Sequence, residues 1–113
     1  ARRGARALRS ARRAPWVGHG REWMMRIHVA VRGRVQGVGF RWFAREAARG
    51  LSLAGWVSNR PDGSVEVAAE GAEQAIAQFR AALHDGPPGA SVSAVDELPA
   101  AAGELPRPFT VVR

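Results

Sequence analysis

The stretch "VRGRVQGVGFRWFARE", residues 31–46, decides the fold, because a strand pattern, a glycine-rich loop and a helix pattern follow one another within it. Apolar and polar residues alternate from Ile27 to Arg34, which is the period of a half-buried β-strand. After the loop, apolar residues recur at three-to-four spacing from Phe40 to Leu51, as in an amphipathic helix. We therefore predict a strand, a loop and a helix over about Arg41–Arg49, which Gly50 ends.

Further strands are predicted on either side of a second helix. A strand near residues 53–58 is followed by the turn sequence "NRPDG" and then by the alternating "SVEVAAE" of residues 64–70, which together predict a hairpin. A helix of about twelve residues ends at the prolines of "DGPPG". Its apolar face consists of Ala72, Ile76, Phe79 and Leu83. Residues 91–98 predict a weaker strand, and residues 109–113 a short last one.

The order of these elements defines the fold class. Strand, helix, strand, strand, helix and strand follow in turn, with a possible final strand. Both strand–helix–strand crossovers bring their helices to the same face of one antiparallel sheet. The prediction is an α+β fold, the ferredoxin-like βαββαβ sandwich.

Charge divides the chain into two parts. Residues 1–23 hold seven arginines against one acid, a net charge of +6, whereas residues 24–113 hold ten arginines against nine acids, a net charge of +1. The first part has no apolar periodicity, so we predict a disordered Arg-rich N-terminal extension over residues 1–23 and one domain over residues 24–113. Two interpretations of the extension stay open: a leader that precedes a natural start at Met24 or Met25, and a basic arm that touches nucleic acid or a membrane.

Composition excludes several classes of protein. The chain has no cysteine, which excludes a disulfide scaffold, a thiolate zinc site and a cysteine nucleophile. Its three histidines are far apart in sequence, so we expect no metal site and no cofactor. No stretch is apolar for long enough to be a secretory signal or a membrane span. We expect a cytoplasmic monomer.

The glycine-rich loop has the features of an anion site. Gly33, Gly37 and Gly39 let the segment between them curl so that backbone N–H groups point inward. The first N–H groups of the following helix have no partner within it, and the helix dipole adds about half a positive charge there. Arg41 adds a planar fork that matches two phosphate oxygens. On composition alone, the alternative that the glycines only shape a turn and Arg41 is solvated stays equally open.

Two motifs resemble the signatures of the acylphosphatase family. The first, "VRGRVQGVGFR" of residues 31–41, matches at Gly33, Val35, Gln36, Gly37, Val38, Phe40 and Arg41. The second, "GWVSNRPDGSVEVAAEG" of residues 55–71, matches at Gly55, Val57, Asn59, Gly63, Val65 and Gly71. The resemblance covers about residues 26–113 and implies an acylphosphatase-like domain with the ferredoxin-like fold. Ser58 departs from it, because many members have a basic residue there.

The resemblance also implies a reaction and a site. Acylphosphatases hydrolyse the carboxyl–phosphate bond of small acyl phosphates to a carboxylate and inorganic phosphate, without metal or covalent intermediate. By motif position, Arg41 is implied as the phosphate-binding arginine and Asn59 as the residue that positions the attacking water. The substrate-binding cradle is implied to be the backbone amides of Val35, Gln36, Gly37, Val38, Gly39 and Phe40. The motifs leave the physiological acyl group unspecified.

Two other functions compete with this one. A non-catalytic nucleic-acid-binding module with a ferredoxin-like fold and a basic arm is the main alternative. RNA-recognition domains, however, stack bases on aromatics within the sequence K/R-G-F/Y-G/A-F-V-x-F/Y, which no predicted strand here carries, so we do not expect a nucleic-acid partner. The second is an acylphosphatase-like domain of a larger enzyme that handles carbamoyl phosphate; we expect a free-standing enzyme instead.

Overall fold

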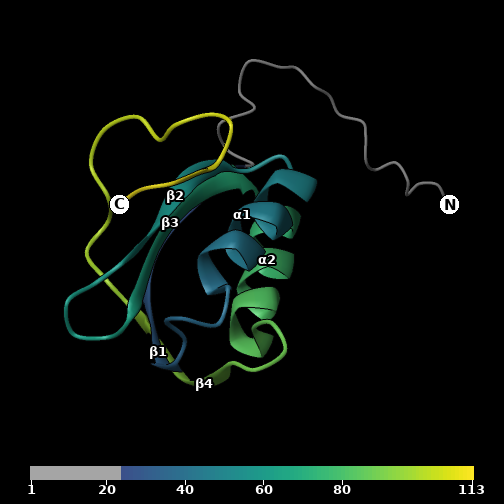
Figure 1. Ribbon diagram of the computed structural model, residues 1–113. Helices are drawn as coiled ribbons and strands as arrows, with labels where there is room; N and C mark the ends of the chain where they lie inside the picture. The colour runs from purple at the N-terminus through teal and green to yellow at the C-terminus, as the bar shows by residue number, and fades with distance from the viewer. Residues whose placement is uncertain (1–23) are drawn as a thin grey trace, which may run out of the picture.

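A single sheet and two helices form the two layers of the fold (Figure 1). The computed structural model describes residues 24–113, so the prediction for residues 1–23 lies outside the described residues. The strands are β1 (Met24–Arg34), β2 (Ala54–Asn59), β3 (Val65–Ala72), β4 (Ser91–Glu97) and β5 (Thr110–Val111), and the helices are α1 (Phe40–Gly50) and α2 (Glu73–Asp85). Neither helix has the length and apolar content to cross a membrane.

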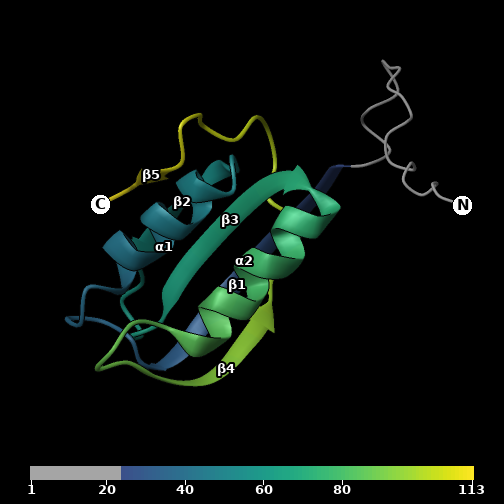
Figure 2. The same cartoon turned by 90° about the vertical axis from the view of Figure 1, so that its right-hand side faces the viewer.

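The strand order β4-β1-β3-β2-β5 confirms the ferredoxin-like topology. Strands β1 and β2 both pair antiparallel with β3, so they run parallel to each other and α1 connects them across β3. Strands β3 and β4 likewise both pair antiparallel with β1, and α2 connects them across β1. Both helices cover the same face of the sheet (Figure 2). The predicted hairpin is the β2–β3 pair.

The predicted all-antiparallel sheet is wrong for one strand, because β5 pairs parallel with β2, with Thr110 opposite Trp56 and Val111 opposite Val57. The reason lies in residues 98–108, which we call the strap. The strap leaves β4 at the end of the sheet where β2 begins, since Leu98 N–H donates to the carbonyl of His28 and the carbonyl of Pro106 accepts from Gly55 N–H. A strand that starts at that end runs alongside β2 in the same direction.

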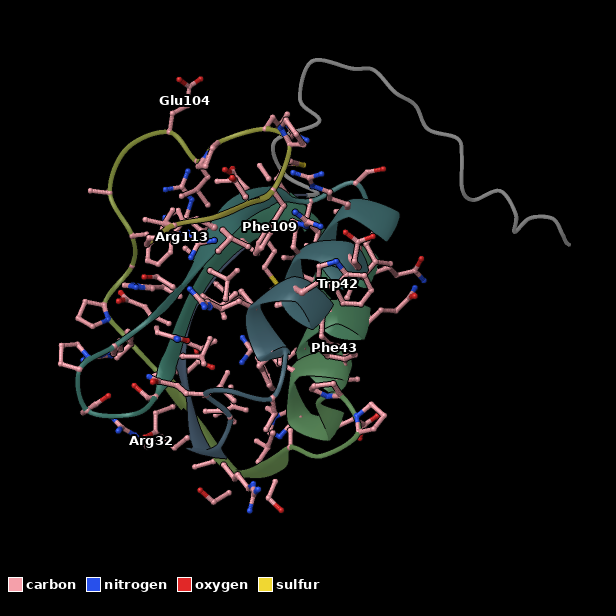
Figure 3. The ribbon with its side chains drawn as sticks, viewed as in Figure 1. Arg32, Trp42, Phe43, Glu104, Phe109 and Arg113 are labelled. Atoms are coloured by element: carbon pink, nitrogen blue, oxygen red, sulfur yellow. The ribbon has the colours of Figure 1, made fainter. Side chains whose placement is uncertain are left out.

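Polar side chains of β1 hold the strap against the sheet face opposite the helices. The Arg26 guanidinium donates to the carbonyls of Ala101 and Gly103 at 2.8 and 2.7 Å. His28 Nδ1 donates to the carbonyl of Pro99 at 2.6 Å. Leu105 is buried against the sheet, whereas Glu104 points away from it (Figure 3). The second face of the sheet is therefore covered by chain that has no regular structure.

The main core lies between the sheet and the helices. Phe40, Phe79 and Phe109 are its largest buried side chains, and the rings of Phe79 and Phe109 meet edge to face at 5.8 Å. Ile76, Phe79 and Leu83 form the buried face of α2 as predicted. Ala72 does not belong to that face, because it precedes the helix and is exposed.

The end of α1 differs from the prediction that Gly50 stops the helix. Gly50 is the last helical residue, and it is Ser52 that takes a positive φ, at 59°. The N–H groups of Leu51 and Ser52 donate to the carbonyls of Ala48 and Arg49, and Leu53 N–H also donates to Ala48. These bonds close the last turn of the helix, so the chain takes its left-handed conformation at Ser52, two residues after Gly50.

Gly33 is also placed differently from the prediction. It lies within β1 rather than in the loop, at a register shift between Arg32 and Gly33 where β1 pairs with β4. Its φ is +122°, and a Cβ there would lie 2.1 Å from the carbonyl oxygen of Ser91. Gly33 therefore allows the close approach of two strands and does not shape the anion loop.

Replacing Gly33 by alanine should destabilise the fold strongly. We expect Gly33→Ala to lower the free energy of unfolding by about 1–3 kcal/mol through backbone strain alone, and further because β1 and β4 must separate. Gly50→Ala is the matched control, since a Cβ there meets no atom within 4 Å and the residue is helical. It should be neutral or stabilising by up to about 1 kcal/mol. Urea unfolding measures both, and equal effects would refute the close approach.

Candidate functional site

The loop between β1 and α1, residues 35–39, contains two glycines with positive φ and leads directly into the N-terminus of the helix. Gly37 and Gly39 have φ angles of 77° and 80°, and a Cβ at either position would meet no atom within 4 Å. The backbone conformation, not lack of space, therefore favours glycine at both positions. Gly39 is the N-cap of α1 and makes no side-chain capping bond, and the first turn holds no acidic residue. The N-terminus of α1 is thus free to bind an anion.

A pocket of about 280 Å³ opens at this loop. Both predicted catalytic residues, Arg41 and Asn59, line it. Of the predicted cradle, Val35, Gly37, Gly39 and Phe40 line it, and Gln36 and Val38 do not. The other lining residues are Trp42, Arg45, Val111 and Arg113.

The Gln36 side chain points from the loop to the β2–β3 turn. Its Nε2 donates to the carbonyls of Arg60 and Ser64 at 2.8 and 2.9 Å. The sequence predicted only a backbone role for Gln36. The sequence around Gln36 could not reveal this second role. The carbonyls that its amide binds lie 24 and 28 residues away in the sequence.

The β2–β3 turn is rigidly bonded. Asp62 Oδ1 accepts from the N–H of Ser64 at 2.9 Å and from its hydroxyl at 2.6 Å. These two bonds hold the pKa of Asp62 well below its usual range, so it is ionised at neutral pH. Arg32 on β1 donates to both Asp62 and Asp96, and these bonds raise its pKa. The turn is therefore anchored to β1 as well as to the loop.

Asn59 is the last residue of β2 and lies directly before this turn. Its Oδ1 is buried and has no hydrogen-bond partner within residues 24–113. A buried polar atom without a partner costs about 1–3 kcal/mol, so its persistence points to a ligand or water at that place. Arg41, on the first turn of α1, is half-buried and makes no hydrogen bond or ion pair with its side chain inside residues 24–113.

These groups line one pocket, and together they have the donors that a tetrahedral oxyanion would require. Free N–H groups at a helix N-terminus, an arginine fork and an amide meet in one pocket. Within the described part of the chain, no group of three histidine, aspartate or glutamate side chains lies close enough to hold a metal ion. The geometry therefore provides for anion binding by backbone amides and arginine.

The pocket also contains residues that the motifs do not indicate. Val111 and Arg113 reach it from β5 and the segment after it, and their place depends on the route of the strap. Trp42 lines the pocket and is 61% exposed at the outside of α1 (Figure 3). Trp56, by contrast, packs on the strap side of the sheet, where its ring meets His28 at 5.8 Å.

Comparison with known proteins gives one consistent family. The acylphosphatase family model matches residues 27–109. An acylphosphatase from Rhizobium etli is 45% identical over 85 residues, which are 75% of this chain and 90% of that protein. The solved structure of an acylphosphatase from Coxiella burnetii is 38% identical, with a TM-score of 0.70, over 81% of this chain and 96% of that one.

One solved structure places a similar unit inside a longer chain. HypF from T. kodakarensis is 32% identical, with a TM-score of 0.69, over 79% of this chain but only 12% of its own length. The described domain thus corresponds to nearly all of an acylphosphatase and to a small part of HypF.

The Gln36 bonds should govern anion affinity. We expect Gln36→Ala to weaken the binding of inorganic phosphate about tenfold and to cost about 1–3 kcal/mol of stability, because two hydrogen bonds of about 0.5–1.5 kcal/mol each are lost. Gln36→Glu should weaken binding more, since it sets a carboxylate against two carbonyls. Titration calorimetry with phosphate measures the affinity, and Gln78→Ala, on the exposed side of α2, is the control. Wild-type affinity in both Gln36 variants would contradict this role.

Proposed function

The chain belongs to the acylphosphatase family, and we propose that it hydrolyses acyl phosphates with Arg41 and Asn59 as its catalytic residues. It is an acylphosphatase, a hydrolase acting on small substrates that carry a carboxyl–phosphate bond. The observation that carries the mechanism is that Arg41 and Asn59, whose Oδ1 has no partner among residues 24–113, line one pocket with the N-terminus of α1. These groups come from segments that are separate in the sequence.

The phosphoryl group binds first to the loop. The N–H groups of residues 35–40 bond its nonbridging oxygens, and the helix dipole adds positive potential at the same place. Arg41 donates two parallel bonds to the same group. Because these donors are preorganised, they stabilise charge that develops on the phosphoryl oxygens without reorganising.

Asn59 orients the attacking water. Its amide cannot take a proton, so its contribution is to hold the water in line with the bond that breaks. Asn59 lines the pocket, and its Oδ1 is an acceptor with no hydrogen-bond partner among residues 24–113, which supports this role. The β2–β3 turn that follows Asn59 is bonded to the loop through Gln36, which keeps water and phosphate in one geometry.

The proton of the water goes to the substrate. Among the described residues that line the pocket there is no aspartate, glutamate or histidine. The water oxygen forms a bond to phosphorus, the bond from phosphorus to the acyl oxygen breaks, and a phosphate oxygen receives the proton. The acyl half leaves as a carboxylate, which is stable at neutral pH and needs no strong general acid.

The alternative of an RNA-binding module is disfavoured by the strap. RNA-recognition domains stack bases on an open sheet face, and here that face is covered by residues 98–108, with Leu105 buried against it. The monomeric state, the cytoplasmic location and the lack of a nucleic-acid partner stay predictions. Gel filtration tests the first of them, and RNA titration at low and moderate salt tests the last.

Loss of the Arg41 guanidinium should remove most of the activity. We expect Arg41→Gln to lower turnover of benzoyl phosphate by about 10²–10³, the effect of one preorganised donor to a developing anion. Absorbance in the presence of EDTA follows the reaction. Arg34→Gln is the matched control, because Arg34 is exposed and does not line the pocket, and it should keep near-wild-type turnover. A folded Arg41→Gln enzyme with normal turnover would contradict the catalytic role of Arg41.

Asn59 should affect turnover more than binding. We expect Asn59→Ala to lower turnover about a hundredfold while the inhibition constant of inorganic phosphate changes little, because water and not phosphate loses its partner. Asn59→Asp should impair both, since its carboxylate repels the phosphate. Steady-state kinetics with phosphate as competitor separates the two effects. Equal losses in Asn59→Ala would mean that Asn59 binds the anion itself.

A further inference from the structure

The outer part of the pocket is more cationic than phosphate binding requires. Three arginines line the pocket, namely Arg41, Arg45 and Arg113, and none of the described lining residues is acidic. Arg41 has its place in phosphate binding. Arg45 and Arg113 belong to neither signature motif, and the proposed reaction gives them no role.

Arg45 and Arg113 approach the pocket from two different elements. Arg45 follows Arg41 by four residues in α1, so both lie on the same side of the helix, about 6 Å apart along its axis. Arg113 follows β5, which flanks β2 at the edge of the sheet. Side chains on two walls therefore lie at one pocket with the phosphate loop.

The two arginines differ in their present partners. Arg45 pairs with the neighbouring Glu46 at 3.1 Å, and both side chains are substantially exposed to solvent. An exposed pair of this kind contributes about 0–1 kcal/mol, so a bound anion can compete for the guanidinium. Arg113 has no side-chain hydrogen bond or ion pair to another residue in the 24–113 range and is exposed.

We infer that Arg45 and Arg113 bind a second anionic group on the acyl half of the substrate. The preferred substrates are then acyl phosphates of dicarboxylic type, with a free carboxylate several ångströms from the phosphoryl group. Arg45 and Arg113 are specificity-determining residues, and Arg41 keeps the phosphate. This inference rests on the proposed acylphosphatase function, whose reaction it does not alter.

General attraction of anions is the competing explanation, and a matched substrate pair separates the two. The pair is 4-carboxybenzoyl phosphate and its methyl ester, which have the same phosphate and nearly the same shape but differ by one negative charge. The readout is the ratio of kcat/KM for the acid to kcat/KM for the ester. Intrinsic reactivity of the two compounds cancels when this ratio is compared between variants.

We expect the acid-to-ester ratio of kcat/KM to be higher for wild type than for the variants Arg45→Gln and Arg113→Gln. Each variant should lower the ratio about fivefold, the size expected of a partly exposed ion pair, and the double variant should lower it further. Arg45→Lys and Arg113→Lys keep the charge and should restore part of the ratio. Arg34→Gln, which removes a charge outside the pocket, should leave the ratio at its wild-type value.

Each other outcome overturns the inference in its own way. If both compounds are hydrolysed but the Arg45→Gln and Arg113→Gln variants keep the wild-type ratio, the two arginines do not bind the second anionic group, and the acylphosphatase function stands. If Arg34→Gln lowers the ratio as much as they do, the effect is net charge and not a site. If wild type hydrolyses neither compound nor benzoyl phosphate, the proposed function itself fails.

Discussion

Two hydrogen bonds from the Gln36 amide join the two halves of the pocket. One half is the loop that leads into α1, and the other is the β2–β3 turn that follows Asn59. Each half is locally stable, the loop through its glycine conformations and the turn through Asp62 and Ser64. The Gln36 bonds and the Arg32 bond to Asp62 fix the two halves relative to each other, in addition to the pairing of β1 and β2 with β3. The proposed positions of phosphate and water relative to each other depend on that arrangement.

The same constraint explains why so few reactive groups are needed. The pocket offers dipoles and arginine, which act on charge and need no change of protonation at neutral pH. A carboxylate leaving group makes a strong acid unnecessary, and positioning supplies most of what phosphoryl transfer requires. In the proposed mechanism, the attachment of the loop to the turn is therefore the main contribution of the fold. The core beneath them, with Phe40 at the start of α1, supports the loop from inside.

The sequence predicted the elements well where the pattern is local. The alternation in β1, the hairpin at "NRPDG" and the buried face of α2 apart from Ala72 were confirmed, because hydrophobic periodicity and turn propensity depend on residues close together in the sequence. The sequence-based prediction was wrong at glycines that can serve more than one structural role. The sequence predicts a helix end at Gly50 and a loop position for Gly33, but the positive φ falls at Ser52, and Gly33 lies in β1 against the Ser91 carbonyl. A glycine by itself does not say which neighbour it must accommodate.

The site divides in the same way. Sequence by itself determined the fold class and the two motifs, and it predicted Arg41 and Asn59 as catalytic residues, since these depend on spacing and on the family signature. Only the tertiary structure decided that Gln36 reaches Arg60 and Ser64, that β5 runs parallel to β2, and that Arg113 stands at the pocket. The direction of β5 and the place of Arg113 depend on how the strap crosses the sheet. The partners of Gln36 depend on which carbonyls of the β2–β3 turn lie near the loop after folding. All three are contacts between distant segments, which no local period or propensity encodes.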